Sequence, residues 1–221
     1  MTDTPTRGTA VRLTDLHRVY GGVAALDGLT LHIEPGEFVA LLGPSGCGKT
    51  TALRCLAGLE DPDSGSLEVG GHDLTRVSAN KRDMGMVFQA YSLFPHMTAR
   101  QNVEFGLELR GRDRATRRAR TAEMLDLVGL DTHADKYAHQ LSGGQQQRVA
   151  IARSLANDPK VLLADEPTAN LDSAAAELIL KLLAQLNQAH GLSLVIATHD
   201  PKLLPYGKRV IRVHDGLIAE A

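Results

Sequence analysis

The chain has 221 residues, of which 43% are hydrophobic and 23% are charged, and its formal net charge is −2. These values indicate one globular domain with a substantial core, and they exclude a protein whose overall charge attracts nucleic acid. No apolar run approaches the roughly 18 residues of a membrane span. The segment Met1 to Gly8 is polar and lacks the apolar stretch of a signal peptide, so a cytoplasmic location is expected.

The predicted elements alternate between strands and helices along the chain. The first 35 residues, including the alternating run Leu29 to Ile33, are expected to form a small antiparallel layer. Apolar runs predict buried strands at Phe38–Leu42, Met84–Phe88, Val161–Ala164 and Ser193–Ala197. Helical patterns predict helices at Thr51–Leu59, Arg114–Val128, Gly143–Leu155 and Ser173–His190. This order indicates an α/β fold with a mostly parallel sheet and crossover helices.

The segment from residue 90 to residue 155 shows no strong strand pattern, and we expect it to be an inserted α-helical subdomain. The core of the same domain is then formed by residues 1–89 and 156–221. A run of arginines lies inside the insertion, and a solvated helix face is its ordinary explanation, with a binding patch as the alternative. The run consists of Arg110, Arg112, Arg114, Arg117, Arg118 and Arg120.

Each of the four buried strands is followed by polar residues. A glycine-rich loop follows the first strand, and Gln89 follows the second. Asp165 and Glu166 end the third, and Thr198-His199-Asp200 follow the fourth. Because ligands of open α/β sheets bind at the carboxyl ends of the strands, these residues are expected to form one site.

The glycine-rich loop matches the phosphate-binding pattern G-x-x-x-x-G-K-[ST]. In this pattern, backbone amides and the start of the next helix approach phosphate oxygens. Lys49 is expected to neutralise the terminal phosphates, Thr50 to offer its hydroxyl to Mg²⁺, and Thr51 to extend the nucleotide site. Cys47 is interpreted as a small tolerated side chain without a redox role. The loop consists of Gly43, Pro44, Ser45, Gly46, Cys47, Gly48, Lys49 and Thr50.

Two adjacent carboxylates, Asp165 and Glu166, follow the apolar run of the third strand. Such a pair is often only a solvated turn, but beside a phosphate loop a division of roles is favoured. Asp165 would help to hold Mg²⁺, and Glu166 would polarise a water molecule for attack on the terminal phosphate.

A second potential phosphate site lies almost a hundred residues after the first. Leu141-Ser142-Gly143-Gly144-Gln145 precedes a helical pattern, and Ser142 with Gln145 fits a capping box. A cap alone does not explain two glycines, each of which weakens a helix by about 1 kcal/mol. Glycines do leave the helix amides open to an anion, so this segment is expected to receive the phosphate of a second molecule's nucleotide.

This segment resembles the signature motif of ABC-type ATPases, the nucleotide-binding subunits of ABC transporters. The resemblance covers nearly the whole chain, because the motifs occur in the family's order. It implies a P-loop NTPase (RecA-like) core and a head-to-tail dimer that binds two ATP molecules with Mg²⁺. Each ATP would lie between one subunit's phosphate loop and Ser142, Gly143, Gly144 and Gln145 of the other.

The same resemblance implies roles for further residues. Tyr20 would stack on adenine, and Gln89 would touch Mg²⁺ and the attacking water. Asp172 would lie in a loop that crosses the dimer interface, and His199 would contact the γ-phosphate. The catalytic set is therefore expected to be Glu166, His199, Gln89 and Lys49, with Thr50, Gln89 and Asp165 at the metal.

The resemblance also implies that ATP hydrolysis drives transport through integral membrane permease subunits on the inner face of the cell membrane. The second ATPase subunit would be a copy of this chain or a homologue, and a substrate-binding protein is a further implied partner. The segment from residue 87 to residue 98 resembles importers of polyamines, sugars or inorganic ions. The 22 residues after His199 cannot hold the regulatory domain that those importers often carry.

Other stretches favour different functions. Ala169 to Ser173 and Thr198 to Pro201 resemble ATPases of lipoprotein-release and macrolide-efflux systems, so import is favoured only slightly. A cell-division ATPase that signals through a membrane partner is also compatible with this length. The tandem domains of translation-factor relatives and the coiled coil of DNA-repair relatives do not occur in the sequence, and a kinase would leave Leu141 to Gln145 unexplained. The sequence does not identify the substrate.

Overall fold

The computed structural model describes residues 8–203 and 205–219. Residues 1–7, on which the expectation about a signal peptide mainly falls, lie outside the described residues. Within the described ranges, none of the helices combines the length and the apolar character that a membrane span requires.

The central sheet has the order β10-β9-β3-β8-β7-β6. Its neighbouring strands are parallel except for the antiparallel pair of β9 and β10. The strands are β3 (Phe38–Leu42), β6 (Met84–Val87), β7 (Val161–Asp165), β8 (Ser193–Thr198), β9 (Arg209–His214) and β10 (Leu217–Ala219). The four predicted buried strands therefore lie side by side in space, although β9 and β10 are additions that the sequence patterns did not predict.

A second, antiparallel sheet has the order β2-β1-β4-β5. It consists of β1 (Val11–Tyr20), β2 (Val23–Ile33), β4 (Ser64–Val69) and β5 (His72–Asp73). The layer is larger than expected from the first 35 residues, because β4 and β5 come from the chain after the first helix. Val11 pairs with Ile33 on one side and with Val69 on the other, so β1 joins the two parts of the layer.

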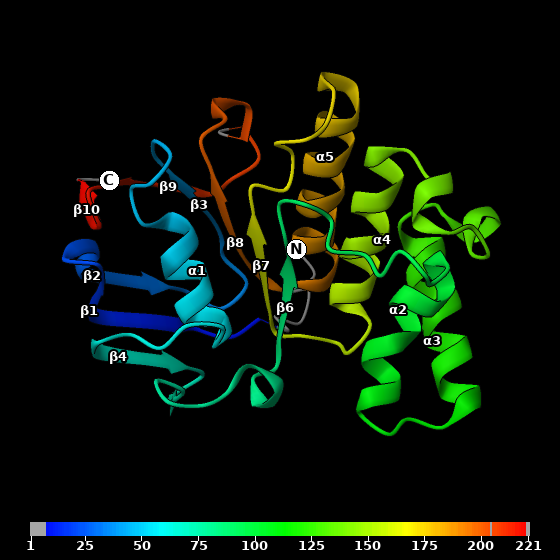
Figure 1. Cartoon of the computed structure of the whole chain (residues 1–221), viewed down its shortest axis with the longest axis horizontal. Helices are drawn as coiled ribbons and strands as arrows, with labels where there is room; N and C mark the ends of the chain where they lie inside the picture. The colour runs from blue at the N-terminus through cyan, green and yellow to red at the C-terminus, as the bar shows by residue number, and fades with distance from the viewer. Residues whose placement is uncertain (1–7, 204, 220–221) are drawn as a thin grey trace, which may run out of the picture.

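Both faces of the central sheet are buried, and alternate residues of its strands enter two different cores. Val39, Leu41 and Leu163 face α1 (Lys49–Ala57), which lies between the two sheets (Figure 1). Ala40 and Leu162 face the opposite core, which includes α5 (Ser173–His190). A strand buried on both faces has a continuous apolar sequence, which is why these strands were recognisable as short apolar runs.

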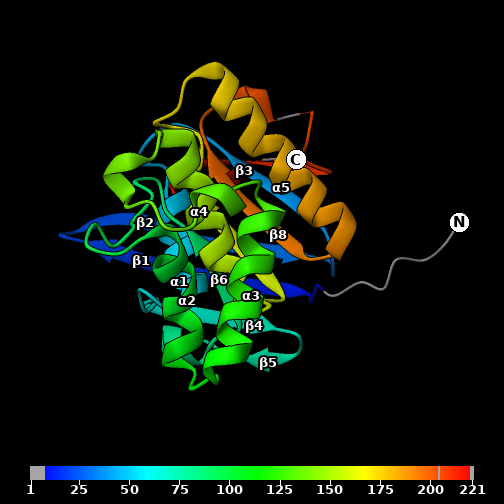
Figure 2. The same cartoon turned by 90° about the vertical axis from the view of Figure 1, so that its right-hand side faces the viewer.

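Three helices from the segment between β6 and β7 lie beyond the edge strand β6, as Figures 1 and 2 show. They are α2 (Ala99–Leu109), α3 (Arg114–Leu127) and α4 (Gly143–Leu155). Helix α2 was not predicted, although Thr98 and Gln101 form a capping box at its start. Short 3₁₀ turns cover Ala79–Lys81, Asp131–His133, Ala138–Gln140 and Pro201–Leu203.

Part of the arginine run holds the three helices together. Arg117 of α3 forms an ion pair with Glu104 of α2 at 3.0 Å, and each of these side chains is only 19% exposed. Arg120 donates hydrogen bonds to the carbonyls of Leu155 and Ala156 at the end of α4. These two arginines are therefore structural connections between helices and not members of a free basic face.

The end of α1 depends on a buried arginine. Arg82, which is 2% exposed, donates to the carbonyl oxygens of Cys55 and Leu56 at 2.7 Å each, and to that of Val77 at 2.7 Å. Burial lowers the pKa of this guanidinium, but arginine remains charged at any physiological pH. The side chain thus adds a charged donor to the carbonyls at the helix end, of which that of Cys55 also accepts the amide of Gly58 at 3.1 Å.

We expect Arg82→Met to lower the free energy of unfolding by about 3 kcal/mol, because it leaves buried carbonyls without a charged donor. Urea unfolding monitored by circular dichroism measures the change. Arg76→Met is the matched control, because Arg76 is exposed and its replacement should change stability by less than about 0.5 kcal/mol. Equal stability of the two variants would contradict the role given to Arg82.

Candidate functional site

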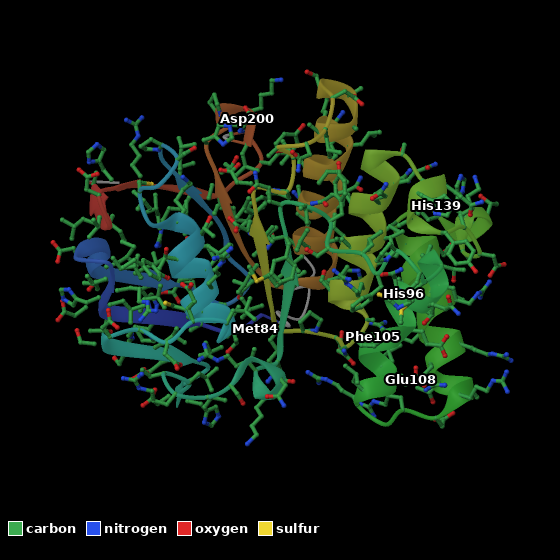
Figure 3. The ribbon with its side chains drawn as sticks, in the orientation of Figure 1. Met84, His96, Phe105, Glu108, His139 and Asp200 are labelled. Carbon is green, nitrogen blue, oxygen red and sulfur yellow. The ribbon has the colours of Figure 1, made fainter. Side chains whose placement is uncertain are left out.

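The polar residues predicted at the ends of four strands lie at one edge of the central sheet. Figure 3 shows this edge near Asp200, which follows β8, whereas Met84 at the start of β6 lies toward the opposite edge. A single cleft at this edge is lined by Ser45, Gly46, Gly48, Lys49, Thr50, Thr51, Gln89, Glu166 and His199. Residues separated by more than 150 positions in the sequence thus contribute to one surface.

The loop between β3 and α1 is formed by close backbone contacts. A Cβ atom on Gly48, whose φ is +103°, would lie 2.3 Å from the carbonyl oxygen of Ala25 in β2. The amide of Gly216, in the turn between β9 and β10, donates to the carbonyl of Cys47 at 3.0 Å. Gly46 has a φ of +82° and open space where its Cβ would stand. The loop is therefore supported from behind and open on the side of the cleft.

Lys49 lies under this loop and is 4% exposed. Its Nζ donates to the carbonyl oxygens of Gly43 and Pro44 at 2.8 Å each, and Cys47 Sγ is 3.6 Å away. The ammonium group is thus held at the centre of the loop that the sequence predicted to bind phosphate. Cys47 is a free, buried cysteine, and its interpretation as a small tolerated side chain stays a prediction.

The donor chemistry at Thr50 and Asp165 fits Mg²⁺. Thr50 Oγ1 donates to Asp165 Oδ1 at 2.8 Å, which places two oxygen atoms side by side. Burial raises the pKa of the Asp165 carboxyl, while the hydrogen bond from Thr50 acts in the opposite direction. The described residues contain no cluster of three or more His, Cys, Asp or Glu side chains suited to a metal. A Mg²⁺ ion here would therefore depend on phosphate and water oxygens for its remaining ligands, as it commonly does.

Glu166 has a left-handed backbone conformation, with a φ of 46°. A non-glycine residue in this region costs about 1–3 kcal/mol and occurs preferentially at functional sites. Its Oε1 lies 2.9 Å from His199 Nδ1, and its Oε2 accepts a hydrogen bond from Thr198 at 3.2 Å. Two residues at the end of β8 therefore hold this carboxylate at the cleft that Lys49 and Thr50 also line.

Gln89 lies in a loop that bonds to the turn after Glu166. Asn170 Nδ2 donates to the carbonyl of Gln89 at 3.0 Å, and the Tyr91 hydroxyl donates to the carbonyl of Asn170 at 3.1 Å. Gln89 lines the same cleft as the phosphate loop. Asn170 and Tyr91 were not predicted as site residues, because neither matches a local chemical pattern and they lie 79 positions apart.

The second predicted phosphate site lies outside this cleft, at the start of α4. Ser142 is the N-cap residue, and the capping box with Gln145 is formed. A Cβ on Gly143 would lie 2.7 Å from the Tyr91 hydroxyl, and one on Gly144 would lie 3.1 Å from Ala175 Cβ. Neighbouring side chains thus leave little space for a side chain at these two positions, which the sequence did not reveal. The sequence predicted only that the glycines leave the helix amides open.

Tyr20 and Asp172 have other contacts in the structure. The Tyr20 hydroxyl donates to Glu60, and the Arg18 guanidinium stands 4.7 Å from the centre of the Tyr20 ring. Asp172 is the N-cap residue of α5 and accepts a hydrogen bond from the amide of Ala175 at 2.9 Å. Neither residue lines the cleft, and their expected roles at adenine and at a dimer interface stay predictions.

Comparison with known proteins gives one family and many relatives. A family model described as ABC transporter matches residues 26–169. The chain is 48% identical over 212 residues to the Fe(3+) ions import ATP-binding protein FbpC 1 of Rhizobium meliloti (strain 1021), covering 96% of this chain and 60% of the relative. It is 47% identical over 206 residues to the sulfate/thiosulfate import ATP-binding protein CysA 2 of Chromobacterium violaceum, covering 93% and 56%. The chain thus spans about 60% of the length of the first of these relatives.

Among solved structures, the chain resembles the ATP-binding cassette MJ0796, described as a dimer in a post-hydrolysis state bound to ADP and Pi. The TM-score is 0.85 and the identity 37%, with 95% of this chain and 97% of the other covered. A second dimeric structure of MJ0796, described as a bacterial ABC transporter cassette, gives a TM-score of 0.86. This similarity confirms the fold class expected from the sequence.

We expect Gly143→Ala to lower the free energy of unfolding by about 1–2 kcal/mol, because the new methyl group would displace the Tyr91 hydroxyl. Adding Tyr91→Phe removes that hydroxyl, so the double variant should be at least as stable as Tyr91→Phe alone, because alanine has the higher helix propensity. Thermal unfolding of the three variants measures this. If the glycine served only to expose amides, alanine would instead raise stability through its higher helix propensity.

Proposed function

The chain belongs to the ABC transporter family, and from this membership we propose that it binds MgATP and hydrolyses it to drive transport through separate membrane subunits. The observation that supports this most directly is the convergence of Lys49, Thr50, Glu166 and His199 on one cleft. Phosphate transfer depends on positioning and charge stabilisation more than on covalent chemistry by the protein. A cleft with a phosphate loop, a metal position and an oriented carboxylate is suited to that task.

Each residue of the cleft has a distinct part in the proposed reaction. Lys49 and the loop amides bind and neutralise the phosphates of ATP, and Thr50 and Asp165 hold Mg²⁺. When bound, Mg²⁺ neutralises charge that develops on the phosphate oxygens. Glu166, oriented by Thr198 and His199, accepts a proton from the attacking water. His199 and Gln89 orient the terminal phosphate and the water.

We infer that the working unit is a dimer. Ser142, Gly143, Gly144 and Gln145 do not line the cleft of their own chain, so they are available to a nucleotide held by another subunit. The similar MJ0796 cassette is described as a dimer. We therefore propose a head-to-tail pair with a copy of this chain or a homologue, in which these residues and Asp172 complete the partner's site.

The names of the relatives support import over lipoprotein release, efflux and cell division. One relative is named for Fe(3+) import and another for sulfate/thiosulfate import, at nearly equal identity. We propose that the substrate is an inorganic ion and that other subunits select it, since a cation and an anion importer resemble this chain equally. The partners would be integral membrane permease subunits, which hold the chain at the inner face of the cell membrane, and a substrate-binding protein.

We expect Glu166→Gln to bind MgATP but to hydrolyse it at least about 100-fold more slowly, because amide nitrogen and oxygen cannot accept the water proton as a carboxylate does. The variant should accumulate as a dimer in the presence of MgATP. Phosphate release and analytical ultracentrifugation measure the two effects. Glu177→Gln is the matched control, because Glu177 is an exposed residue of α5 whose ion pair is with Lys181. Normal turnover by Glu166→Gln would remove Glu166 from the role of base.

The transport function is tested by co-purification from native membranes and by uptake of radioactive ions. Permease subunits should co-purify with the chain, and uptake should stop in cells that carry only Glu166→Gln. Turnover that does not respond to any membrane partner would contradict the transport function while leaving ATP hydrolysis intact.

A further inference from the structure

The loop that carries Gln89 contains two neighbouring non-glycine residues in left-handed conformation. The φ angles are 56° at Tyr91 and 50° at Ser92. Residues other than glycine, asparagine and aspartate rarely adopt this conformation, and they keep it only where surrounding contacts enforce it. The contacts that enforce it therefore also decide where Gln89 stands.

Arg153, in the last turn of α4, supplies these contacts. Its Nη1 donates to the carbonyl of Ser92 at 2.6 Å, and its Nη2 donates to the carbonyl of Tyr91 at 3.3 Å. The guanidinium carbon also lies 5.8 Å from the centre of the Phe94 ring. One planar group thus binds both strained peptides and covers the next aromatic side chain, which a flexible ammonium group cannot do.

The two ends of the loop are held by different elements. Asn170, in the turn after β7, donates to the carbonyl of Gln89 at 3.0 Å. Asn102 of α2, which is fully buried, accepts a hydrogen bond from the amide of Phe94 at 2.8 Å and donates to the Phe94 carbonyl at 3.2 Å. The middle of the loop is bound to α4 through Arg153, so three elements meet at this short segment.

We propose that Arg153 is a positioning residue that holds Gln89 in the cleft through the backbone of residues 91 and 92. The expected effect on kinetics rests on the proposed hydrolysis of ATP, whereas the expected effect on the structure of the loop does not. Helix α4 runs without interruption from Gly143 to Leu155. Gly143, which follows the Ser142 cap, and Arg153, which holds the Gln89 loop, therefore belong to one rigid element. A displacement of the start of α4 therefore reaches Gln89 through Arg153.

A matched control lies on the same helix. Arg148 Nη1 donates to the carbonyls of Val128 at 2.8 Å and Gly129 at 3.3 Å. It makes the same kind of contact as Arg153, but to the turn after α3, which does not line the cleft. Arg153→Lys and Arg148→Lys thus remove equivalent hydrogen bonds. The bonds of Arg153 hold the loop that carries Gln89, whereas those of Arg148 hold the turn after α3.

Hydrogen exchange of the full chain, with and without MgATP, tests the structural part. We expect Arg153→Lys to raise the exchange rate of the amides of residues 90–94 by roughly 10-fold through local opening, whereas Arg148→Lys should leave them unchanged. Equal exchange in the two variants would overturn the proposal. Arg153→Gln, which keeps one amide donor without a charge, gives a second measurement if the lysine variant does not fold.

Kinetics test the connection to Gln89. We expect Arg153→Lys to lower kcat by roughly 10-fold with little change in KM for ATP, because it displaces a group at the reacting centre and not the phosphate loop. Combined with Gln89→Ala, it should cause no further loss, since its effect acts through Gln89. Independent, multiplying effects would contradict the proposal. If the wild-type chain did not hydrolyse ATP, the proposed function would fail, and hydrogen exchange alone would decide the role of Arg153.

Discussion

The burial of both faces of the central sheet is the constraint on which the site depends. Strands β3, β7 and β8 send alternate apolar side chains into two separate cores, so a charged group in the middle of a strand would lose its hydration without a partner. Polar residues can therefore stand only where these strands end. Parallel pairing then brings Asp165, Thr198 and the loop after Leu42 to the same edge. The cleft is a consequence of where polar groups are allowed to lie.

Much of this arrangement was predictable because its signals are local. A continuous apolar run indicates a strand buried on both faces, and the spacing of Gly43, Gly48 and Lys49 specifies a phosphate loop. The elements missed were those without such signals: in β9 charged residues interrupt the apolar ones, β10 has only three residues, and α2 is recognised mainly by its capping box at Thr98. The helix predicted to end at Leu59 ends earlier for an equally local reason, because Gly58, whose φ is 72°, caps α1.

The contacts that arrange the site could not be predicted, because they join residues far apart in the chain. Arg153 binds the carbonyl of Ser92, 61 positions earlier, and a side-chain donor to a backbone carbonyl leaves no pattern in the sequence. Gly143 shows the opposite difficulty. The sequence correctly marked it as unusual, but only the structure shows that the Tyr91 hydroxyl occupies the space of its missing side chain. Its presence therefore reflects packing within the chain as well as any contact with a phosphate.

The position of β3 has a consequence for the order in which the protein forms during synthesis. Its two neighbours are β8 and β9, and the turn at Gly216 supports the phosphate loop through Cys47. When residues 38–50 leave the ribosome, the strands β8 and β9 that pair with β3 are still about 150 residues away along the chain. At the usual rate of roughly 5–20 residues per second, that interval lasts on the order of ten seconds. All strands of the antiparallel layer lie within residues 11–73, so the partners of that layer are available well before those of β3.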